Sequence, residues 1–329
     1  MIIIFSVSND YTTFEVMKWL NYMGQKNVLR INSDEKDNII FKLNNDKCEL
    51  SINGQEVDLD DVSAVWYRKG GNWFGQQFED ISINNSPELS RYMNYVSDNE
   101  NKVLNNYIHY LIKRKVRVLG SAFKSNLNKL MTLDQAKSVG LSIPDFHVSN
   151  ELQEMKNLTN SHEDYITKSM SDGVYYFDSE HSETAYFTYT ENLTNEGLQG
   201  LPEKIAPSFA QCKIEKKHEV RTFFLDGEFY SWAILSQNDD KTKTDYRKYN
   251  NTKPNRNLSM NIPEHVQSKL RKLFALIGLN TGSIDLMVDH NEQYYFLEIN
   301  PVGQFGLLSS LSNCQIEKHV ATWLIQNEK

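Results

Sequence analysis

Residues 281–305 read TGSIDLMVDHNEQYYFLEINPVGQF, and this stretch decides how the rest of the chain is interpreted. Two short segments in it, Ile284 to Val288 and Tyr294 to Ile299, have the length and the apolar content of β-strands. The polar residues 289–292 between them are typical of a tight turn. The pattern therefore predicts a β-hairpin.

Three oxygen-bearing side chains should share one face of that hairpin. Because side chains alternate between the two faces of a strand, Asp285 is expected on the same side as Glu298 and Asn300. Two carboxylates and an amide suit Mg²⁺, which takes few protein ligands and completes its shell with water and nucleotide phosphates. The alternative is an acidic, solvated face, but Glu298 lies in an apolar strand where an uncompensated carboxylate would be costly. A magnesium and nucleotide site is predicted.

Composition limits the partners of the chain. It has 329 residues with 40% hydrophobic content, enough for two or three packed lobes. The net charge of −8 and the sequence pI of about 5.6 argue against nucleic acid and favour a cationic peptide segment.

The compartment is expected to be the cytoplasm. Cys48, Cys212 and Cys314 are odd in number and widely spaced, so neither a disulfide framework nor a zinc site is predicted. The first residues, MIIIFSV, lack a basic leader and a cleavage site and are expected to form a buried strand. No apolar run reaches membrane-spanning length, so no membrane contact is expected.

The order of elements indicates a mixed α/β (α+β) protein. A strand and helix unit opens the chain, strands follow up to Val62–Tyr67, and a largely helical stretch runs from Ser82 to Lys113. Later helices are expected from Pro263 to Gly278, behind the hairpin, and over residues 315–326. Arg68 follows a buried strand, where it is expected either to bind phosphate or carboxylate or to be a solvated strand end.

Two lysines are candidates for nucleotide binding. Lys168 is expected on a strand beside a short Ser and Gly loop that starts at Ser169, whose backbone N–H groups could cover phosphates. No G-x-x-x-x-G-K-[ST] sequence is present, which excludes a P-loop enzyme. Lys129 starts a helix, and its alternative is an exposed helix lysine. We expect Lys168 to contribute more to ATP binding than Lys129 does.

Residues 281–305 resemble the C-terminal signature of the ATP-grasp ligases, in which a D-x-x-x-D strand and an E-x-N-P strand hold two magnesium ions against ATP. The resemblance implies an ATP-grasp fold and ATP and Mg²⁺ as cofactors. It assigns Asp285, Glu298 and Asn300 to the metal, and Lys129, Lys168 and the lid loop at Ser169 to the phosphates.

The same resemblance extends to a hinge segment and two arginines. It gives Gln211 and the backbone of Lys213 and Ile214 to the adenine, and an acid near Glu215 or Glu219 to the ribose. Arg221, in E-x-R, faces the transferred phosphate, and the fork of Arg247 suits a phosphoryl or carboxylate group.

Within the superfamily, five segments resemble the graspetide maturases, a family that includes the microviridin-type ligases and the grasp-with-spasm maturases. They are MIIIFSVSNDYTT, VWYRKGG, Q-x-x-[IV]-x-K-x-x-E-x-R, SQ…TDYR and FLEINPVGQF. The resemblance implies ATP-dependent macrocyclisation of a ribosomal precursor peptide, leader plus core, joining Asp or Glu side chains to Thr or Ser hydroxyls or Lys amines. The alternatives are a RimK-like ligase that adds an amino acid to a carboxylate, and a peptide-binding module without catalysis.

Three domains are expected from this resemblance. They are an N-terminal α/β domain over 1–120, a central subdomain with the phosphate lid over 121–205, and a C-terminal subdomain with hinge and metal hairpin over 206–329. A homodimer is compatible with the sequence.

Overall fold

The computed structural model describes residues 1–35, 39–44, 47–71, 73–74, 86–171, 176–178, 184–186, 188–237 and 256–327. Contacts between Cα atoms divide the chain into two compact units. Unit 1 comprises Met1–Ser125, Leu279–Gly282 and Pro301–Lys329, and unit 2 comprises Asn126–Gly278 and Ser283–Asn300. The division into three domains at residues 120 and 205 stays a prediction.

The main sheet of unit 1 has four parallel strands in the order β2-β1-β6-β7. They are β1 (Ile2–Ser6), β2 (Val28–Asn32), β6 (Ala64–Tyr67) and β7 (Arg117–Leu119). Every residue of β1 and β6 is buried, as expected for central strands that are covered on both faces. The predicted burial of the first strand is therefore confirmed.

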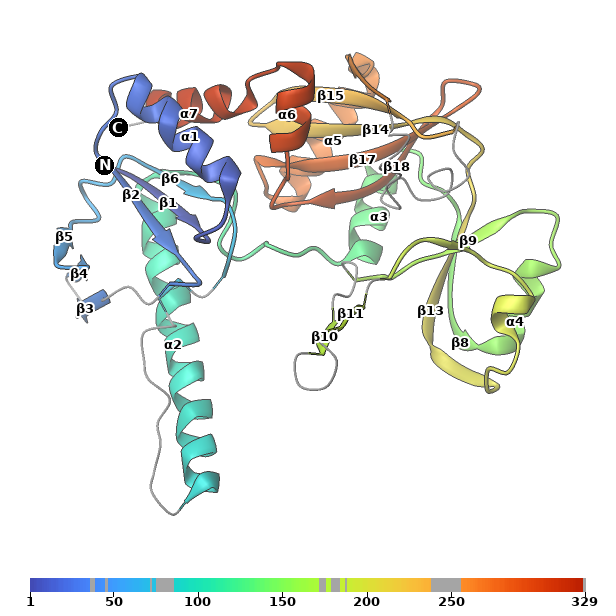
Figure 1. Cartoon of the computed structure of the whole chain (residues 1–329), viewed down its shortest axis with the longest axis horizontal. Coiled ribbons are helices and arrows are strands. Elements are labelled where there is room, and N and C mark those ends of the chain that lie inside the picture. Colours follow the sequence, from blue (N-terminus) through green and yellow to red (C-terminus); the bar gives the residue numbers. More distant parts are fainter. Residues whose placement is uncertain are drawn as a thin grey trace. The chain divides into compact units, whose positions relative to one another are not determined.

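Helices cover both faces of this sheet (Figure 1). α1 (Tyr11–Tyr22) packs against α7 (Ile316–Gln326), which also contacts β6. α2 (Pro87–Lys115) contributes Ile108 and Ile112 to the core cluster that contains Ile3 and Phe5. The remaining elements are the short helix α6 (Gly306–Ser312) and an antiparallel sheet of β3 (Ile39–Leu43), β4 (Cys48–Ile52) and β5 (Gln55–Val57). The predicted helix over 82–113 is confirmed from Pro87 onward, and residues 82–85 lie outside the described residues.

A buried ion pair fixes the carboxyl end of β6. The side chain of Arg68 is 2% exposed, and its Nε donates to the Asp10 carboxylate at 3.0 Å. Asp10 is also the N-cap of α1, where it accepts from the backbone N–H of Thr13 at 3.2 Å. Burial by itself would raise the pKa of Asp10, but Arg68 and Thr13 together hold that pKa below its usual value. Arg68 is thus not the solvated strand end that was one expectation from the sequence.

An aromatic cluster fills the core beside this pair. The hydroxyl of Tyr67 lies 2.9 Å from Nδ1 of His109. The centroid of the His109 ring lies 5.0 Å from that of Phe5, 5.2 Å from that of Trp73 and 5.2 Å from that of Phe74. His109 is fully buried, and burial lowers its pKa to about 3. It is therefore neutral in the folded protein at ordinary pH.

Unit 2 contains two larger sheets and a small hairpin, β10 (Tyr176–Asp178) with β11 (Thr184–Tyr186). The first sheet has the order β12-β9-β13-β8 and packs against α4 (Leu152–Thr159). Its strands are β8 (Phe146–Glu151), β9 (Tyr165–Thr167), β12 (Glu191–Asn192) and β13 (Lys204–Cys212). The strands of the second sheet come after these in the sequence. A short 3-10 helix, η1 (Glu196–Leu198), lies near α4.

The second sheet has five strands in the order β16-β15-β14-β17-β18. They are β14 (Lys216–Leu225), β15 (Glu228–Leu235), β16 (Arg256–Met260), β17 (Thr281–Asp289) and β18 (Tyr294–Asn300). The last two form the predicted hairpin, which is confirmed. The sheet packs against α5 (Glu264–Ile277), and α3 (Lys129–Ser138) contacts both β18 and α5.

The helix α5 covers one face of this sheet. The ring of Phe274 in α5 lies 4.2 Å from the ring of Phe224 in β14, measured between centroids. Because side chains alternate, Arg221, three residues before Phe224, points to the opposite face. α5 ends at Gly278, whose φ of 73° is the left-handed conformation that glycine adopts without strain. The predicted helix behind the hairpin is confirmed.

The cysteines and the helices bear on the predicted lack of disulfides and of membrane-spanning segments. All three cysteines are free thiols. No helix among those the structure describes has both the length and the apolar character that crossing a bilayer requires.

We expect His109 to make unit 1 sensitive to acid. An unfolded histidine takes up a proton near pH 6.5, whereas buried His109 does so only near pH 3, so the unfolded state binds more protons between these values. Stability is therefore fully present above pH 6.5 and falls as the pH drops, by about 2 kcal/mol at pH 5 relative to pH 7.5. The measurement is urea unfolding at both pH values, followed by tryptophan fluorescence.

The matched variants are His109→Asn and, as control, His162→Asn, which removes an exposed histidine of unit 2. His109→Asn should flatten the pH dependence and His162→Asn should leave it as in the wild type. Equal pH dependence in all three proteins would show that His109 is not the acid-sensitive group.

Candidate functional site

The hairpin β17–β18 places two carboxylates directly opposite each other. The strand register pairs Asp285 with Glu298 and Ser283 with Asn300. Residues that face each other, and residues two apart on one strand, lie on the same face, so Asp285, Glu298 and Asn300 share a face as predicted. The ladder has an irregularity after Asp285, where a β-bulge interrupts the pairing. The side chain of Glu298 is 39% exposed, so it is less buried than its apolar strand suggested.

Two cations approach the carboxylate pair from neighbouring elements. Nη1 of Arg221, on β14, lies 3.4 Å from the Asp285 carboxylate. Nζ of Lys129, at the start of α3, lies 3.1 Å from the Glu298 carboxylate. Like charges that face each other across strands repel, and these two cations oppose that repulsion. The arrangement brings together four of the predicted site residues.

The oxygen donors fit a magnesium ion. Both carboxylates are partly exposed, at 26% for Asp285 and 39% for Glu298, and the Asn300 amide is exposed on the same face. Among the described residues no group of three or more His, Cys, Asp or Glu side chains could hold a metal. Two carboxylates and one amide leave coordination positions for water and phosphate, as Mg²⁺ prefers. Their assignment to the metal stays a prediction.

Lys129 also connects this hairpin to Ser169, where the predicted lid loop starts. Its Nζ donates to the backbone carbonyl of Ser169 at 2.9 Å, and its side chain is only 11% exposed. The alternative, an exposed helix lysine, therefore does not apply, and the predicted contact of Lys129 with phosphates stays a prediction. Lys168 follows β9 by one residue, and its Nζ lies 6.0 Å from the centre of the Phe209 ring. Residues 172–175 of the predicted lid lie outside the described residues.

The predicted hinge connects the two large sheets of unit 2. β13 ends at Cys212 in one sheet and β14 begins at Lys216 in the other, so Lys213 and Ile214 lie in the connection. The backbone N–H of Lys213 donates to the carbonyl of Asp164 at 2.8 Å, which leaves the carbonyl of Lys213 as the group that a base could use. Gln211 is 1% exposed, and its amide nitrogen has no hydrogen-bond partner in the part of the chain that the structure describes. Buried donors usually have a hydrogen-bond partner, and the predicted contact of Gln211 with adenine stays a prediction.

Glu219 is part of a buried ion pair. It contacts Lys216 and accepts a hydrogen bond from the Ser236 hydroxyl at 3.3 Å. Burial raises the pKa of the Glu219 carboxyl, and the neighbouring Lys216 ammonium opposes this effect only in part. Its predicted contact with ribose stays a prediction.

Sequence reasoning did not single out Lys216 or Ser283. Lys216 was present in the hinge pattern, and its spacing of three residues from Glu219 was the signal that could have identified the pair. Ser283 faces Asn300 and is 2% exposed, and no described residue forms a hydrogen bond with its hydroxyl. No local sequence signal marks it. Arg247 lies outside the described residues, and its role stays a prediction.

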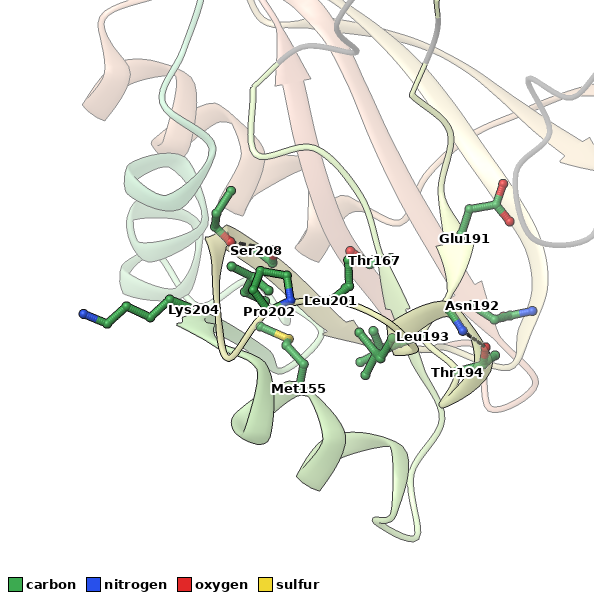
Figure 2. Close-up of a pocket in the computed structure, with 14 residues that line it drawn as sticks. Met155, Thr167, Glu191, Asn192, Leu193, Thr194, Leu201, Pro202, Lys204 and Ser208 are labelled. Carbon is green, nitrogen blue, oxygen red and sulfur yellow. Dashed lines mark hydrogen bonds between the residues drawn. The ribbon is translucent and has the colours of Figure 1, made fainter.

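A separate cavity of about 600 Å³ lies beside the β12-β9-β13-β8 sheet of unit 2. Its apolar lining includes Met155 of α4 together with Leu193 and Leu201 (Figure 2). Figure 2 shows the charged ends of Glu191 and Lys204 directed away from the cavity. Without converging charges this cavity does not suit phosphates or a metal, so the candidate chemistry lies at the hairpin.

The sequence of the N-terminal part matches a known family. Residues 1–107 match the model of the MvdD pre-ATP grasp domain. No curated protein is similar enough to the chain to count as a match.

Three solved structures are similar over nearly the whole length. One is a RiPP-associated ATP-grasp ligase from Chryseobacterium gregarium in complex with ADP and a leader and core peptide, with 24% identity, coverage of 100% of this chain and 98% of that chain, and a TM-score of 0.78. Another is the macrocyclase MdnC from Microcystis aeruginosa bound with precursor peptide MdnA, with 24% identity, 99% coverage of each chain and a TM-score of 0.74. The third is the ATP-grasp ligase PsnB complexed with minimal precursor, Mg and ADP, with 16% identity, coverage of 100% and 97%, and a TM-score of 0.75.

We expect Asp285→Asn and Glu298→Gln to remove magnesium-dependent stabilisation while the protein stays folded. Each variant deletes one of two facing negative charges, so the ligand-free fold should be as stable as the wild type. In the wild type, Mg²⁺ with ADP at about 100 times the dissociation constant should add about 2.7 kcal/mol. Thermal unfolding with and without Mg²⁺ measures the difference.

Glu292→Gln is the matched control, because Glu292 lies in the turn of the same hairpin and pairs with Lys217 at the surface. It should respond to Mg²⁺ as the wild type does. If both carboxylate variants kept the full magnesium response, the hairpin would not be the metal site.

Proposed function

We propose, on the basis of the ATP-grasp fold that this chain shares with these ligases over its whole length, that it is an ATP-dependent macrocyclase of a ribosomally made precursor peptide. The observation that carries the proposal is the carboxylate pair of Asp285 and Glu298, held between Arg221 and Lys129. Such a set of charges suits a divalent cation and the phosphates of a nucleotide.

The reaction proceeds in two steps. A carboxylate oxygen of a peptide Asp or Glu attacks the γ-phosphorus of ATP, and the bond from that phosphorus to the bridging oxygen breaks, which gives an acylphosphate and ADP. A Thr or Ser hydroxyl, or a Lys amine, then attacks the acyl carbon. The carbon–oxygen bond to phosphate breaks, and the proton of the nucleophile leaves with the phosphate. The peptide loses the elements of one water molecule for each ring that forms.

Mg²⁺, when bound by Asp285, Glu298 and Asn300, supplies positive charge to the phosphate oxygens. Arg221 is near enough to Asp285 to hold the transferred phosphate beside that metal site. Lys129 fixes the start of the lid loop through Ser169 and keeps a positive charge beside Glu298. These groups orient charged partners, and ring closure then follows from the proximity of the two peptide side chains.

The environment of the protein fits a peptide substrate. A net charge of −8 disfavours nucleic acid and favours a peptide with basic segments. Three free thiols suit a reducing compartment, the cytoplasm. In the family that the chain resembles, the precursor consists of a leader, which stays bound between closures, and a core. A homodimer is part of this proposal.

The geometry changes the expected order of the two lysines. Because Lys129 joins Glu298 to the lid loop, we expect Lys129→Met to weaken ATP binding more than Lys168→Met does. Losing a charge-assisted contact should raise the dissociation constant roughly tenfold to a hundredfold. Nucleotide titration measures it, with Lys137→Met, an exposed lysine at the other end of α3, as control. A larger loss in Lys168→Met would restore the order expected from the sequence.

The function itself is tested by mass spectrometry of a precursor peptide with Thr, Ser or Lys and Asp or Glu repeats. Incubation with the protein, ATP and Mg²⁺ should remove one water per ring and release ADP and phosphate in equal amounts. Asp285→Asn should form no ring. Formation of AMP, or a peptide that gains the mass of an amino acid, would instead indicate a different class of ligase.

A further inference from the structure

The long helix α2 carries an exposed apolar stripe along one side. Six large apolar side chains share an arc of about 60° on this helix, at 3.6 residues per turn. They are Leu89, Tyr92, Val96, Val103, Tyr107 and Tyr110. Val96 is partly exposed, and the other five are between 44% and 69% exposed. We call this set the α2 stripe, and it runs for about 32 Å along the helix.

The α2 stripe has no part in the core of unit 1. The helix packs into that core through Ile108 and Ile112, which lie on the side of α2 opposite the stripe. None of the residues from Pro87 to Glu100 is buried, and this part of α2 extends beyond the four-stranded sheet of unit 1 (Figure 1). Single exposed apolar side chains are ordinary, but a continuous stripe of this length is typical of an interaction surface.

The spacing of the stripe is symmetric along the helix. Its members follow one another at intervals of 3, 4, 7, 4 and 3 residues, so the pattern is the same in both directions. Its midpoint lies between Asn99 and Glu100. A two-fold symmetric contact needs a surface that is complementary to itself, in which residue i meets residue j and residue j meets residue i. An antiparallel second copy of α2 satisfies this condition along the whole stripe.

The charges at the two ends of α2 favour the same orientation. The first turn carries Glu88, and the last turn is basic, with Lys113 exposed and Lys115 paired with Asp60. An antiparallel copy brings the acidic end of each helix beside the basic end of the other, whereas a parallel copy brings like charges together. Glu88 and Lys113 lie on the same flank of the stripe, where residues of two antiparallel helices meet.

The area of the stripe is sufficient for a weak dimer. The rings of Tyr107 and Tyr110 stack with their centroids 6.0 Å apart and form an exposed aromatic surface. A tyrosine that is half exposed still offers about 100 Å². Covering the stripe would bury roughly 600 Å² on each chain, compared with about 800 Å² per partner in a standard interface. Such an area is compatible with a dissociation constant in the micromolar range.

We propose that two copies of this chain pair through the α2 stripe, antiparallel, about a two-fold axis near Asn99 and Glu100. In this arrangement Leu89 of each copy lies near Tyr110 of the other. The inference deepens the proposed function and rests on it for the homodimer, to which it assigns a surface. It is independent of the peptide chemistry.

The first test changes the apolar contacts. Tyr92→Ser and Val103→Ser replace exposed side chains with a residue of similar helix propensity. Each substitution is present twice in a symmetric pair, so each should raise the dissociation constant about tenfold or more, and the double variant should be a monomer. Sedimentation equilibrium of the full chain, without ATP or peptide, measures this constant. Tyr22→Ser is the matched control, because it removes an exposed tyrosine from α1 of the same unit, and it should pair as the wild type does.

The second test uses the charge nearest the axis. Residues beside a two-fold axis meet their own copies, so the two Glu100 carboxylates repel each other in the pair. Glu100→Gln should therefore lower the dissociation constant about twofold to threefold. Asp98→Asn removes the same charge from the opposite side of α2 and should leave the constant unchanged. Because a damaged fold would weaken the pair, a gain in affinity reports on the interface itself.

Three results would overturn the inference. One is a wild type that stays monomeric up to about 100 μM, well above the expected dissociation constant. Another is a dimer that the double serine variant leaves intact. The third is a monomeric chain whose serine variants lose affinity for a precursor peptide, which would assign the stripe to that peptide. Failure of the proposed function shows differently, as a dimer that responds to these substitutions as expected but forms no rings.

Discussion

The repulsion between Asp285 and Glu298 is the constraint on which the candidate site depends. The two carboxylates face each other across a β-hairpin, so the hairpin needs positive charge on that face. Arg221 brings it from the neighbouring strand and Lys129 from a helix. The two cations therefore connect the five-stranded sheet with α3, and Lys129 extends this set of contacts to the backbone of Ser169.

The ion pairs of this protein divide into two kinds by burial. The Arg68–Asp10 pair in unit 1 is 2% and 8% exposed, and its charges are too desolvated to exchange partners at low cost. The pairs at the hairpin are more exposed, up to 39% for Glu298, so a cation or phosphate can replace a protein partner there. Burial thus separates charges that build the fold from charges that are available to ligands.

The proposed acylphosphate route depends on positive charge and on the orientation of the reacting groups. It would need no protein nucleophile, since a peptide substrate would provide both the carboxylate and the attacking group. Gln211 at the hinge and Ser283 on the hairpin are buried, and each carries a polar atom with no hydrogen-bond partner among the described residues. None of the described residues that line the large apolar cavity beside Met155 has a buried polar atom without a partner, so this cavity differs from the hairpin in its chemistry.

The sequence by itself determined the hairpin, α5 with its glycine end, the buried first strand and the ATP-grasp fold, because each depends on local periodicity, turn residues or a contiguous motif. It also predicted which carboxylates share a face, since alternation along a strand is a local rule. Only the tertiary structure decided that Lys129 reaches Glu298, that Arg68 is buried against Asp10 and that Lys216 pairs with Glu219 inside the protein. Which charges meet, and how far water is excluded from them, depends on contacts between distant segments and on burial, and neither is encoded in a residue's neighbours along the chain.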